Sequence, residues 1–373
     1  MLNNQYRTWI EISQKAITHN YKTFRSLVNP KVKYLAVVKS NAYGHELIGF
    51  AKAQSKLGAD FLGVDSITEA KSLRESGIKK PILVLGYTLP IHFGLAEKYK
   101  ISLTISSAQG LTALIKSGKK VKIHLKLDTG MHRQGFFVND LEKVCELLNQ
   151  HSKILVEGVY THFASAKKPD SHNETEKQIL QFKQAVSIIR AAGFSPITHA
   201  AATAGTLNYP EAHFDMVRIG IGMYGLWPSP ETQKVMEKKY PLLPALTWKS
   251  IISEAKWVEK GEKVGYDYTE TLQMKSLLAV VPIGYWHGYW RAFSGKASVL
   301  AGGKRCKVVG RIAMDMIVID ITGVPKVKAG DEVVLIGKQG KEEISAGELA
   351  QLAGTTHYEV VTRLNPLIKK VYL

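Results

Sequence analysis

The sequence predicts an α/β protein, with a (β/α)8 TIM-like barrel in its N-terminal two thirds followed by a mostly β C-terminal domain. Short apolar runs alternate with amphipathic helical stretches about eight times. Strands that alternate with helices in this way pair in parallel. Eight such units fit a closed barrel, with an open doubly wound sheet as the alternative. Beyond Tyr240 the pattern changes to short strands separated by turns.

The individual elements follow from the hydrophobic pattern. Barrel strands are expected at residues 34–38, 61–64, 82–85, 101–105, 121–125, 155–160, 197–200 and 216–219. Helical periodicity predicts helices that include residues 68–75, 141–148 and 176–191. In the second domain, strands are expected at residues 277–283, 297–300, 306–309, 317–321 and 332–336. Glycines predict hairpin turns at residues 302–303 and 337–340.

The composition is that of a soluble globular protein, with 45% hydrophobic and 22% charged residues. The net charge of +18 comes from scattered basic residues without interleaved aromatic residues, so specific nucleic-acid binding is not expected. No apolar run predicts a signal peptide or a membrane span. With only Cys145 and Cys306, the chain has no disulfide framework, and a cytoplasmic location fits best.

Residues 37–45, with the sequence VVKSNAYGH, carry the most informative functional signal. Lys39 directly follows a predicted buried strand, and Tyr43 and Gly44 follow in a predicted turn. A lysine at the mouth of a buried strand can be desolvated, which lowers its pKa and frees a nucleophilic amine. Such an amine is what a Schiff-base enzyme needs. For an isolated lysine, a solvent-exposed strand end would be the ordinary interpretation.

Polar residues also lie at the ends of other predicted strands, namely Lys126, His162, Thr203 and Arg218, and Gly220 is at the end of the last one. In a barrel, residues at the C-terminal ends of the strands face the active site. Each residue alone has an ordinary explanation, such as a core histidine or an ion-paired arginine. Their shared position predicts a functional site.

Several blocks resemble the alanine racemase family, whose members are fold-type III enzymes that depend on pyridoxal 5′-phosphate. Besides residues 37–45, the blocks are residues 124–131, 161–164, 216–220, 283–285, 310–315 and 356–359, in family order. The resemblance covers nearly the whole chain. It implies a cofactor-binding barrel at residues 12–240 and a β-rich domain at residues 241–373, which the N-terminal strand (residues 1–11) joins.

The resemblance also implies roles for the cofactor-binding residues. Lys39 would hold the cofactor covalently, His162 would pack on its ring, and Arg218 would face the pyridine nitrogen, with His199 orienting Arg218. A guanidinium keeps its proton, so the ring would be a weaker electron sink and transamination would be discouraged. No metal is expected. The phosphate would be bound by Tyr43, Thr203, Tyr358 and the backbone N–H groups of Gly220 and Ile221.

For catalysis, the resemblance implies that Lys39 and Tyr266 act on opposite faces of the substrate, with Tyr268 as the rival to Tyr266. In the family this tyrosine comes from the other subunit, so a head-to-tail homodimer with shared sites is implied. Arg133 would bind the carboxylate of a small amino-acid substrate, and Lys126 matches a carbamylated lysine. Tyr285, Met314 and Asp315 would line the substrate entrance.

The expected function is interconversion of L- and D-alanine, supplying D-alanine for peptidoglycan. The alternatives are a broader racemase acting on serine, lysine or arginine, a decarboxylase, and a non-catalytic cofactor-binding protein. A decarboxylase is disfavoured because the segment around Cys306 does not resemble the active-site cysteine block of that group. The chain departs from the family pattern at four positions, which hold His132, Ala202, His287 and Ala313.

Overall fold

The computed structural model describes residues 5–167, 172–324 and 326–373. The chain divides into two compact units. The barrel unit comprises Lys15–Ala42 and Leu47–Leu243, and the β unit comprises Met1–Gln14, Tyr43–Glu46 and Pro244–Leu373. The short segment Tyr43–Glu46 thus belongs to the β unit although the barrel unit surrounds it in sequence.

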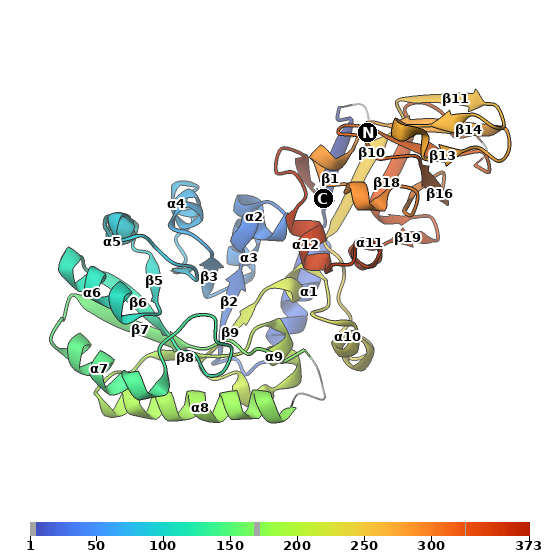
Figure 1. Ribbon diagram of the computed structural model, residues 1–373. Coiled ribbons are helices and arrows are strands. Elements are labelled where there is room, and N and C mark those ends of the chain that lie inside the picture. Colours follow the sequence, from blue (N-terminus) through green and yellow to red (C-terminus); the bar gives the residue numbers. More distant parts are fainter. Residues whose placement is uncertain (1–4, 168–171, 325) are drawn as a thin grey trace. The chain divides into compact units, whose positions relative to one another are not determined.

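Eight parallel strands form the wall of the barrel unit, in the order β8-β7-β6-β5-β4-β3-β2-β9 (Figure 1). A parallel bridge between Ala202 and Arg218, with an N–H···O bond from Arg218 to Ala201 (2.9 Å), joins the two edges of this sheet. The sheet is therefore a nearly closed barrel, and the predicted fold class is confirmed. The strands are β2 (Lys33–Val37), β3 (Phe61–Val64), β4 (Ile82–Val84), β5 (Ser102–Ile105), β6 (Val121–Lys126), β7 (Ile154–Tyr160), β8 (Ile197–His199) and β9 (Met216–Ile219).

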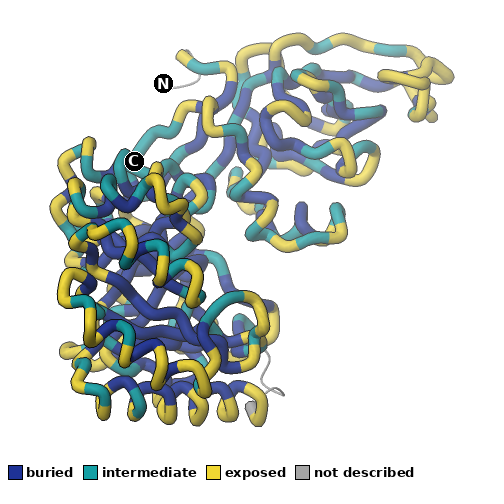
Figure 2. Tube along the Cα trace, turned by 60° about the vertical axis from the view of Figure 1, so that its left-hand side comes forward, coloured by how far each residue is buried: buried dark blue, intermediate teal, exposed yellow. Residues whose placement is uncertain are grey.

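Helices cover the outside of the barrel, so the strands are buried and the outer helix faces are exposed (Figure 2). Ser66, Ser107 and Ser229 cap three of these helices by accepting a backbone N–H from the first turn. Among the described residues, no helix is long and apolar enough to cross a membrane. The α-helices are α1 (Gln14–Ser26), α2 (Lys39–Tyr43), α3 (Leu47–Leu57), α4 (Ile67–Glu75), α5 (Phe93–Tyr99), α6 (Ala108–Ser117), α7 (Leu141–Asn149), α8 (His172–Ala191), α9 (Thr203–Asn208) and α10 (Pro230–Met236).

The β unit is built on a sheet in the order β11-β14-β17-β16-β15-β18-β10-β1-β20, with β19 paired to β18 (Figure 1). The N-terminal strand β1 pairs antiparallel with β10 and parallel with β20. Trp9, Trp248 and Tyr289 are fully buried in this unit. The strands of this sheet are β1 (Thr8–Ile12), β10 (Leu246–Ile251), β11 (Glu254–Val258), β14 (Ser276–Val281), β15 (Ser298–Ala301), β16 (Lys304–Val309), β17 (Ile317–Asp320), β18 (Glu332–Gln339), β19 (Glu342–Ile344) and β20 (Lys369–Tyr372).

The β unit also contains a short hairpin, β12 (Lys263–Val264) with β13 (Glu270–Thr271), and the helices α11 (Ala346–Ala353) and α12 (His357–Thr362). The predicted turn at Gly302 and Gly303 is confirmed: both have positive φ and join β15 to β16. The other predicted turn was placed too early, because β18 continues through Gly337 and the turn begins at Gly340.

Candidate active site

Basic side chains gather at the C-terminal ends of the barrel strands. Lys39 follows β2, Lys126 ends β6, and Arg218 lies in the second half of β9. Thr203 begins α9, shortly after β8. Because all eight strands are parallel, these ends share one face of the barrel.

The sequence predicted a desolvated amine at Lys39, but the structure shows a partly exposed one. Its side chain is 36% exposed, and its Nζ lies 3.1 Å from Oδ1 of Asp65. The residues that follow form a left-handed helical turn, with φ of 55°, 55° and 51° at Ser40, Asn41 and Ala42. A left-handed conformation costs a non-glycine residue roughly 1–2 kcal/mol. The backbone that directly follows Lys39 is therefore strained.

Glu69 of α4 helps to hold this left-handed turn. The Asn41 N–H donates to Oε1 of Glu69 (3.2 Å), and Oδ1 of Asn41 accepts the N–H of Leu47 (3.0 Å). The second carboxylate oxygen of Glu69 accepts the N–H of Asp65 (2.9 Å). One glutamate thus connects the strained turn to the residue that pairs with Lys39.

Arg218 is buried inside the barrel and donates to neutral acceptors. Its Nη1 donates to Nδ1 of His199 (3.0 Å) and to the carbonyl of the same residue (3.1 Å). Its Nη2 donates to the carbonyls of Thr161 and Ala200 (both 2.8 Å) and to Nδ1 of His162 (3.2 Å). Burial lowers the pKa of Arg218 to about 10, so the guanidinium stays charged at neutral pH. The predicted contact with His199 is confirmed.

Lys126 ends β6 with its side chain buried, and its Nζ lies 4.8 Å from the ring centroid of Tyr160. The guanidinium carbon of Arg218 lies 5.1 Å from the same ring. Burial first, and then the positive charges of Arg218 and Arg133, lower the pKa of Lys126 to about 7. This lysine, rather than Lys39, therefore has the desolvated amine.

Thr203 and the backbone after β9 are joined by hydrogen bonds. Oγ1 of Thr203 accepts the N–H of Gly220 (3.0 Å) and of Gly222 (3.4 Å). A Cβ at Gly222 would lie 2.3 Å from the Phe24 ring, so only glycine fits there. Ile221 follows Gly220 and begins the 3₁₀ helix η6 (Ile221–Tyr224). Successive backbone N–H groups beside a hydroxyl are a typical donor set for a phosphate group.

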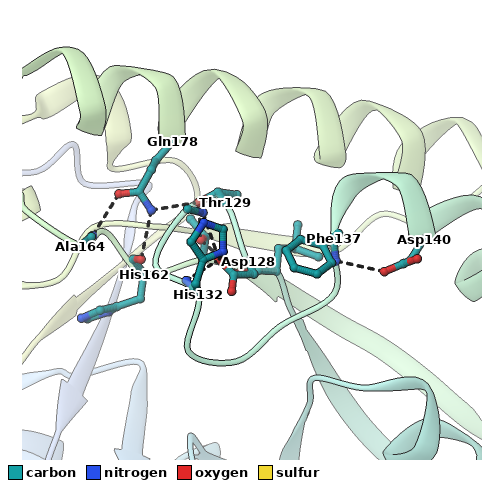
Figure 3. Close-up of polar contacts among 11 residues, drawn as sticks. Asp128, Thr129, His132, Phe137, Asp140, His162, Ala164 and Gln178 are labelled. Atoms are coloured by element: carbon teal, nitrogen blue, oxygen red, sulfur yellow. Dashed lines mark hydrogen bonds and ion pairs between the residues drawn. The ribbon is translucent and has the colours of Figure 1, made fainter.

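The loop after β6 carries Arg133 and is held by Asp128 (Figure 3). Oδ1 of Asp128 accepts the N–H groups of Gly130 and His132 (both 3.0 Å). Burial opposes ionisation of Asp128, but these bonds still hold its pKa below the ordinary value. His132 has φ of 53°, a left-handed conformation that glycine adopts without strain. This conformation explains why the family pattern has glycine where this chain has His132.

Gln178 of α8 joins the loops that follow β6 and β7 (Figure 3). Its Nε2 donates to Oγ1 of Thr129 (3.3 Å) and to the carbonyl of His162 (3.5 Å), and its Oε1 accepts the N–H of Ala164 (3.0 Å).

Burial first, and then the charge of Arg218, hold the pKa of His162 well below its ordinary value. The imidazole beside Arg218 is therefore neutral.

Tyr43 and Tyr358 lie together in the β unit, with ring centroids 6.3 Å apart. Tyr358 is the second residue of α12. A Cβ at Gly44 would lie 2.0 Å from the carbonyl oxygen of Val361 in the same helix, so only glycine permits this packing. Burial, with the nearby Tyr43, raises the pKa of Tyr358 well above its ordinary value and keeps its hydroxyl protonated.

Tyr266 and Tyr268 lie in an exposed segment of the β unit, each with 67% exposure. The preceding Val264 is buried in a small hydrophobic cluster, which anchors the segment. Nη1 of Arg311 pairs with Oδ2 of Asp267 (3.2 Å). Both tyrosines are therefore exposed to solvent on a loop that is anchored by Val264 and by the Arg311–Asp267 ion pair.

The segments around Tyr285 and Met314 are joined by backbone bonds. The N–H of Tyr285 donates to Ala313 O (3.1 Å), and the N–H of Trp286 donates to Met314 O (3.0 Å). His287 is buried, its Nδ1 accepts the N–H of Gly284 (3.2 Å), and it lies 3.9 Å from Oδ1 of Asp315. We call the exposed apolar side chains here the aromatic patch; it consists of Tyr266, Tyr268, Tyr285, Trp286, Met314 and Met316.

The sequence predicted no role for Tyr160, Glu157, Asp65 or Gln178, and His124 stood out only as part of a block that resembles the family. For His124 a signal existed, because Lys122, His124 and Lys126 alternate along β6 and so share one face of the strand. In the described parts of the chain, no three His, Cys, Asp or Glu side chains are grouped as metal ligands.

Replacing Lys126 with methionine is expected to stabilise the protein below neutral pH. The folded-state pKa of about 7 lies below the ordinary 10.5, so the unfolded chain binds the proton more tightly. Between these pH values the unfolded state holds more protons, so this group makes folding more favourable as pH rises. Below pH 7 the buried lysine imposes its full cost on folding. In that range Lys126→Met should gain at most about 5 kcal/mol in the free energy of unfolding.

Urea unfolding in carbon dioxide-free buffer at pH 6, 8 and 10 measures this gain. It should shrink steadily and vanish near pH 10.5, the ordinary pKa of lysine. Lys116→Met, an exposed position on α6, is the control and should change little at any pH. A Lys126→Met gain that does not vary with pH would contradict the assignment.

Comparisons with known proteins agree along the whole chain. Residues 12–228 match the family profile described as "Alanine racemase, N-terminal domain", and residues 245–372 match "Alanine racemase, C-terminal domain". The alanine racemase of Symbiobacterium thermophilum is 38% identical over 376 residues, covering 100% of this chain and 98% of the relative. That of Desulforamulus reducens is 38% identical, covering 98% of each chain.

Solved structures agree with this. The alanine racemase of Clostridium difficile 630 has a TM-score of 0.92 at 35% identity, covering 99% of this chain and 96% of that one. The alanine racemase of Bacillus anthracis with bound L-Ala-P has a TM-score of 0.93 at 35% identity, covering 98% and 95%. With both domains matched in order, this chain belongs to the alanine racemase family.

Proposed function

We propose that this chain interconverts L- and D-alanine with pyridoxal 5′-phosphate as its cofactor. The relatives above are named alanine racemases, one solved relative carries L-Ala-P, and another is a complex with cycloserine. The observation that carries the proposal is the set of groups at one end of the barrel. A primary amine at Lys39, a buried guanidinium at Arg218 and the donors around Thr203 lie on one face.

This donor set fits the cofactor. An aldehyde needs a primary amine, which Lys39 supplies, and an anionic phosphate offsets the positive charges that depress the pKa of Lys126. When bound, the cofactor withdraws electrons from the substrate and acidifies its α-proton. The phosphate would be held by Tyr43, Thr203, Tyr358 and the backbone N–H groups of Gly220 and Ile221.

Arg218 would present an N–H to the ring nitrogen of the cofactor, with His162 against the ring face. Because its pKa is about 10, Arg218 keeps its protons at neutral pH and would not transfer one to the ring nitrogen of the cofactor. Its bonds to three carbonyls and two imidazoles fix the plane of the guanidinium. Held in this way, Arg218 would favour return of the proton to the α-carbon over transamination.

Nζ of Lys39 and Oη of Tyr266 would remove and return the α-proton from opposite faces of the substrate. Tyr266 belongs to the β unit and to the aromatic patch, whose large exposed side chains are typical of an interface. We infer that this patch packs on a second copy of the chain, head to tail, so that each Tyr266 completes the partner's site. Tyr268 is the rival assignment.

Arg133 would bind the substrate carboxylate through paired N–H donors. Tyr285, Met314 and Asp315 would line the substrate entrance. Lys126 would hold Arg133 as a carbamate, which forms when the unprotonated amine bonds to carbon dioxide and releases a proton. Its pKa of about 7 makes that amine available at neutral pH, and the nearby guanidinium groups favour the anion.

In the cell, this activity would supply D-alanine for peptidoglycan from the cytoplasm. Racemases of broader range, acting on serine, lysine or arginine, share the chemistry described for Lys39 and Tyr266. A decarboxylase would release carbon dioxide instead of the opposite enantiomer. The same assay panel separates these activities.

Purified protein with pyridoxal 5′-phosphate should convert either enantiomer of alanine to the racemate faster than serine, lysine or arginine. Borohydride should fix the cofactor on Lys39, because its amine lies at the barrel face that carries Arg218 and Thr203. Peptide mass mapping locates the adduct, and Lys39→Ala should abolish it. Lys126→Ala should retain the adduct on Lys39, and an adduct on Lys126 in the unmodified sequence would contradict the assignment.

Mixed dimers test the shared site. Lys39→Ala and Tyr266→Phe should each lower activity on the order of a hundredfold or more, the scale for a positioned acid or base. Co-expression with different affinity tags should restore part of the activity, because one site of the mixed dimer holds both residues. Tyr268→Phe is the control and should stay active. Purified mixed dimers without restored activity would count against shared sites.

The carbamate on Lys126 has its own spectroscopic test. Protein held in ¹³C-bicarbonate should show a carbamate carbon signal that disappears in Lys126→Met. Acidification well below pH 7 should remove the signal, because protonation of the amine competes with the carbamate. A signal that persists in Lys126→Met would refute the assignment.

A further inference from the structure

A continuous line of buried polar groups runs through the interior of the barrel, starting from Arg218. Nη1 of Arg218 lies 3.0 Å from Nδ1 of His199, and Nε2 of His199 lies 2.8 Å from Nδ1 of His124. Nε2 of His124 lies 3.3 Å from Oε2 of Glu157. Both histidines are fully buried. We call His199 and His124 the histidine pair.

The two ends of this line fix the direction of every hydrogen bond in it. A guanidinium has only donors and an ionised carboxylate has only acceptors, so with both ends in place Nδ1 of His199 accepts and its Nε2 carries the proton. Nδ1 of His124 must then accept, and its Nε2–H must donate to the carboxylate of Glu157. Burial lowers the pKa of both histidines, so each is neutral and has one proton to place. Only one tautomer of each histidine satisfies all contacts.

The acceptor at the far end is a permanent carboxylate. Oε1 of Glu157 accepts from Nζ of Lys122 (2.6 Å), and Oε2 accepts from Oγ of Ser102 (2.5 Å). Burial alone would raise the pKa of Glu157, but its bonds to His124, Lys122 and Ser102 lower it to about 2. The three groups Glu157, Lys122 and Ser102 line a cavity of about 970 Å³. Ser102 and Lys122 lie at the starts of β5 and β6, so the cavity is at the end of the barrel opposite the face that carries Lys39.

Two local features of β7 allow this line of hydrogen-bonded groups to form. Ile123 pairs with Val156 and His124 pairs with Gly158, so Glu157 is an extra, unpaired residue in β7. Such a bulge re-aims a side chain relative to its strand. A Cβ at Gly158 would lie 2.2 Å from Nδ1 of His124, so glycine is required where the imidazole crosses the strand.

We propose that Glu157 and His124 are positioning residues for Arg218, acting through His199. They ensure that His199 presents a lone pair, and never an N–H, to the guanidinium. Without the carboxylate, the histidine pair could adopt the reversed tautomers, with an N–H of His199 facing an N–H of Arg218. That repulsion would displace Arg218 from its position at the barrel end. Only the effect on catalysis rests on the proposed function; the tautomers do not.

Nitrogen NMR of ¹⁵N-histidine-labelled holoenzyme tests the tautomers directly. His124 and His199 should both show a protonated Nε2 and an unprotonated Nδ1 from pH 6 to 8.5, with assignments from His124→Gln and His199→Gln. Glu157→Ala should give mixed tautomers. Glu157→Gln should largely retain the native tautomers, because its amide oxygen can still accept from His124. A protonated Nδ1 on His199 in the unmodified protein overturns the proposal without any variant.

Kinetics and the absorption spectrum of the bound cofactor provide a second test. In Glu157→Ala, kcat for alanine should fall roughly ten- to a hundredfold, the scale known for groups that orient metal ligands, while KM changes much less. The absorption maximum of the bound cofactor should shift, and Glu157→Gln should restore part of kcat. Glu97→Ala changes another carboxylate lining the same cavity and should leave all readouts unchanged.

The two proposals fail in different ways. If the unmodified protein racemises no alanine, the proposed function fails, and the NMR result still decides the tautomers. If Glu157→Ala folds, by its circular dichroism and melting temperature, and keeps native tautomers, cofactor spectrum and kcat, the positioning role is wrong. If Glu157→Ala does not fold, Glu157→Gln and the spectrum of the unmodified protein decide.

Discussion

The interior of the barrel depends on one buried cation, Arg218, whose hydrogen-bond acceptors among the described residues include no carboxylate. Moving a guanidinium out of water is expensive unless its donors are satisfied. Arg218 meets this need with backbone carbonyls and imidazole nitrogens. Neutral acceptors leave its charge uncompensated. Burial first, and then this charge, lower the pKa of Lys126 and of His162. The carboxylate of Glu157 lies two imidazoles away and pairs with Lys122.

Most barrel strands could be read from the sequence because parallel strands under helices are buried on both faces and appear as apolar runs. The strands at residues 61–64 and 216–219 were predicted with the observed bounds. The β unit was harder. The edge strands β11 and β20 were missed because an edge is partly exposed and polar, as the sequences EAKWV and KKVY are. β10 was missed although its alternating burial follows the usual pattern of a strand with one buried face.

For the site, the sequence predicted which residues occupy strand ends but not how their charges are balanced. Lys39 was expected to be desolvated, yet Asp65, from the next strand–helix connection, reaches its amine. The role of Glu157 could not be found, because it depends on a register shift between β6 and β7 that no local pattern shows. The left-handed turn was likewise hidden, since Ser40, Asn41 and Ala42 include no glycine to mark it.

That left-handed turn has a consequence for protein engineering. Glycine adopts such a conformation without steric penalty, so a library selected only for thermal tolerance would tend to enrich glycine at Ser40 or Ala42. Glycine also opens many other conformations to the same segment. The present residues have far fewer alternatives once Asn41 is tied to Glu69 and Leu47. The strained residues therefore keep this segment rigid. In a variant that relieves the strain, the neighbouring Lys39 amine would point in a broader range of directions.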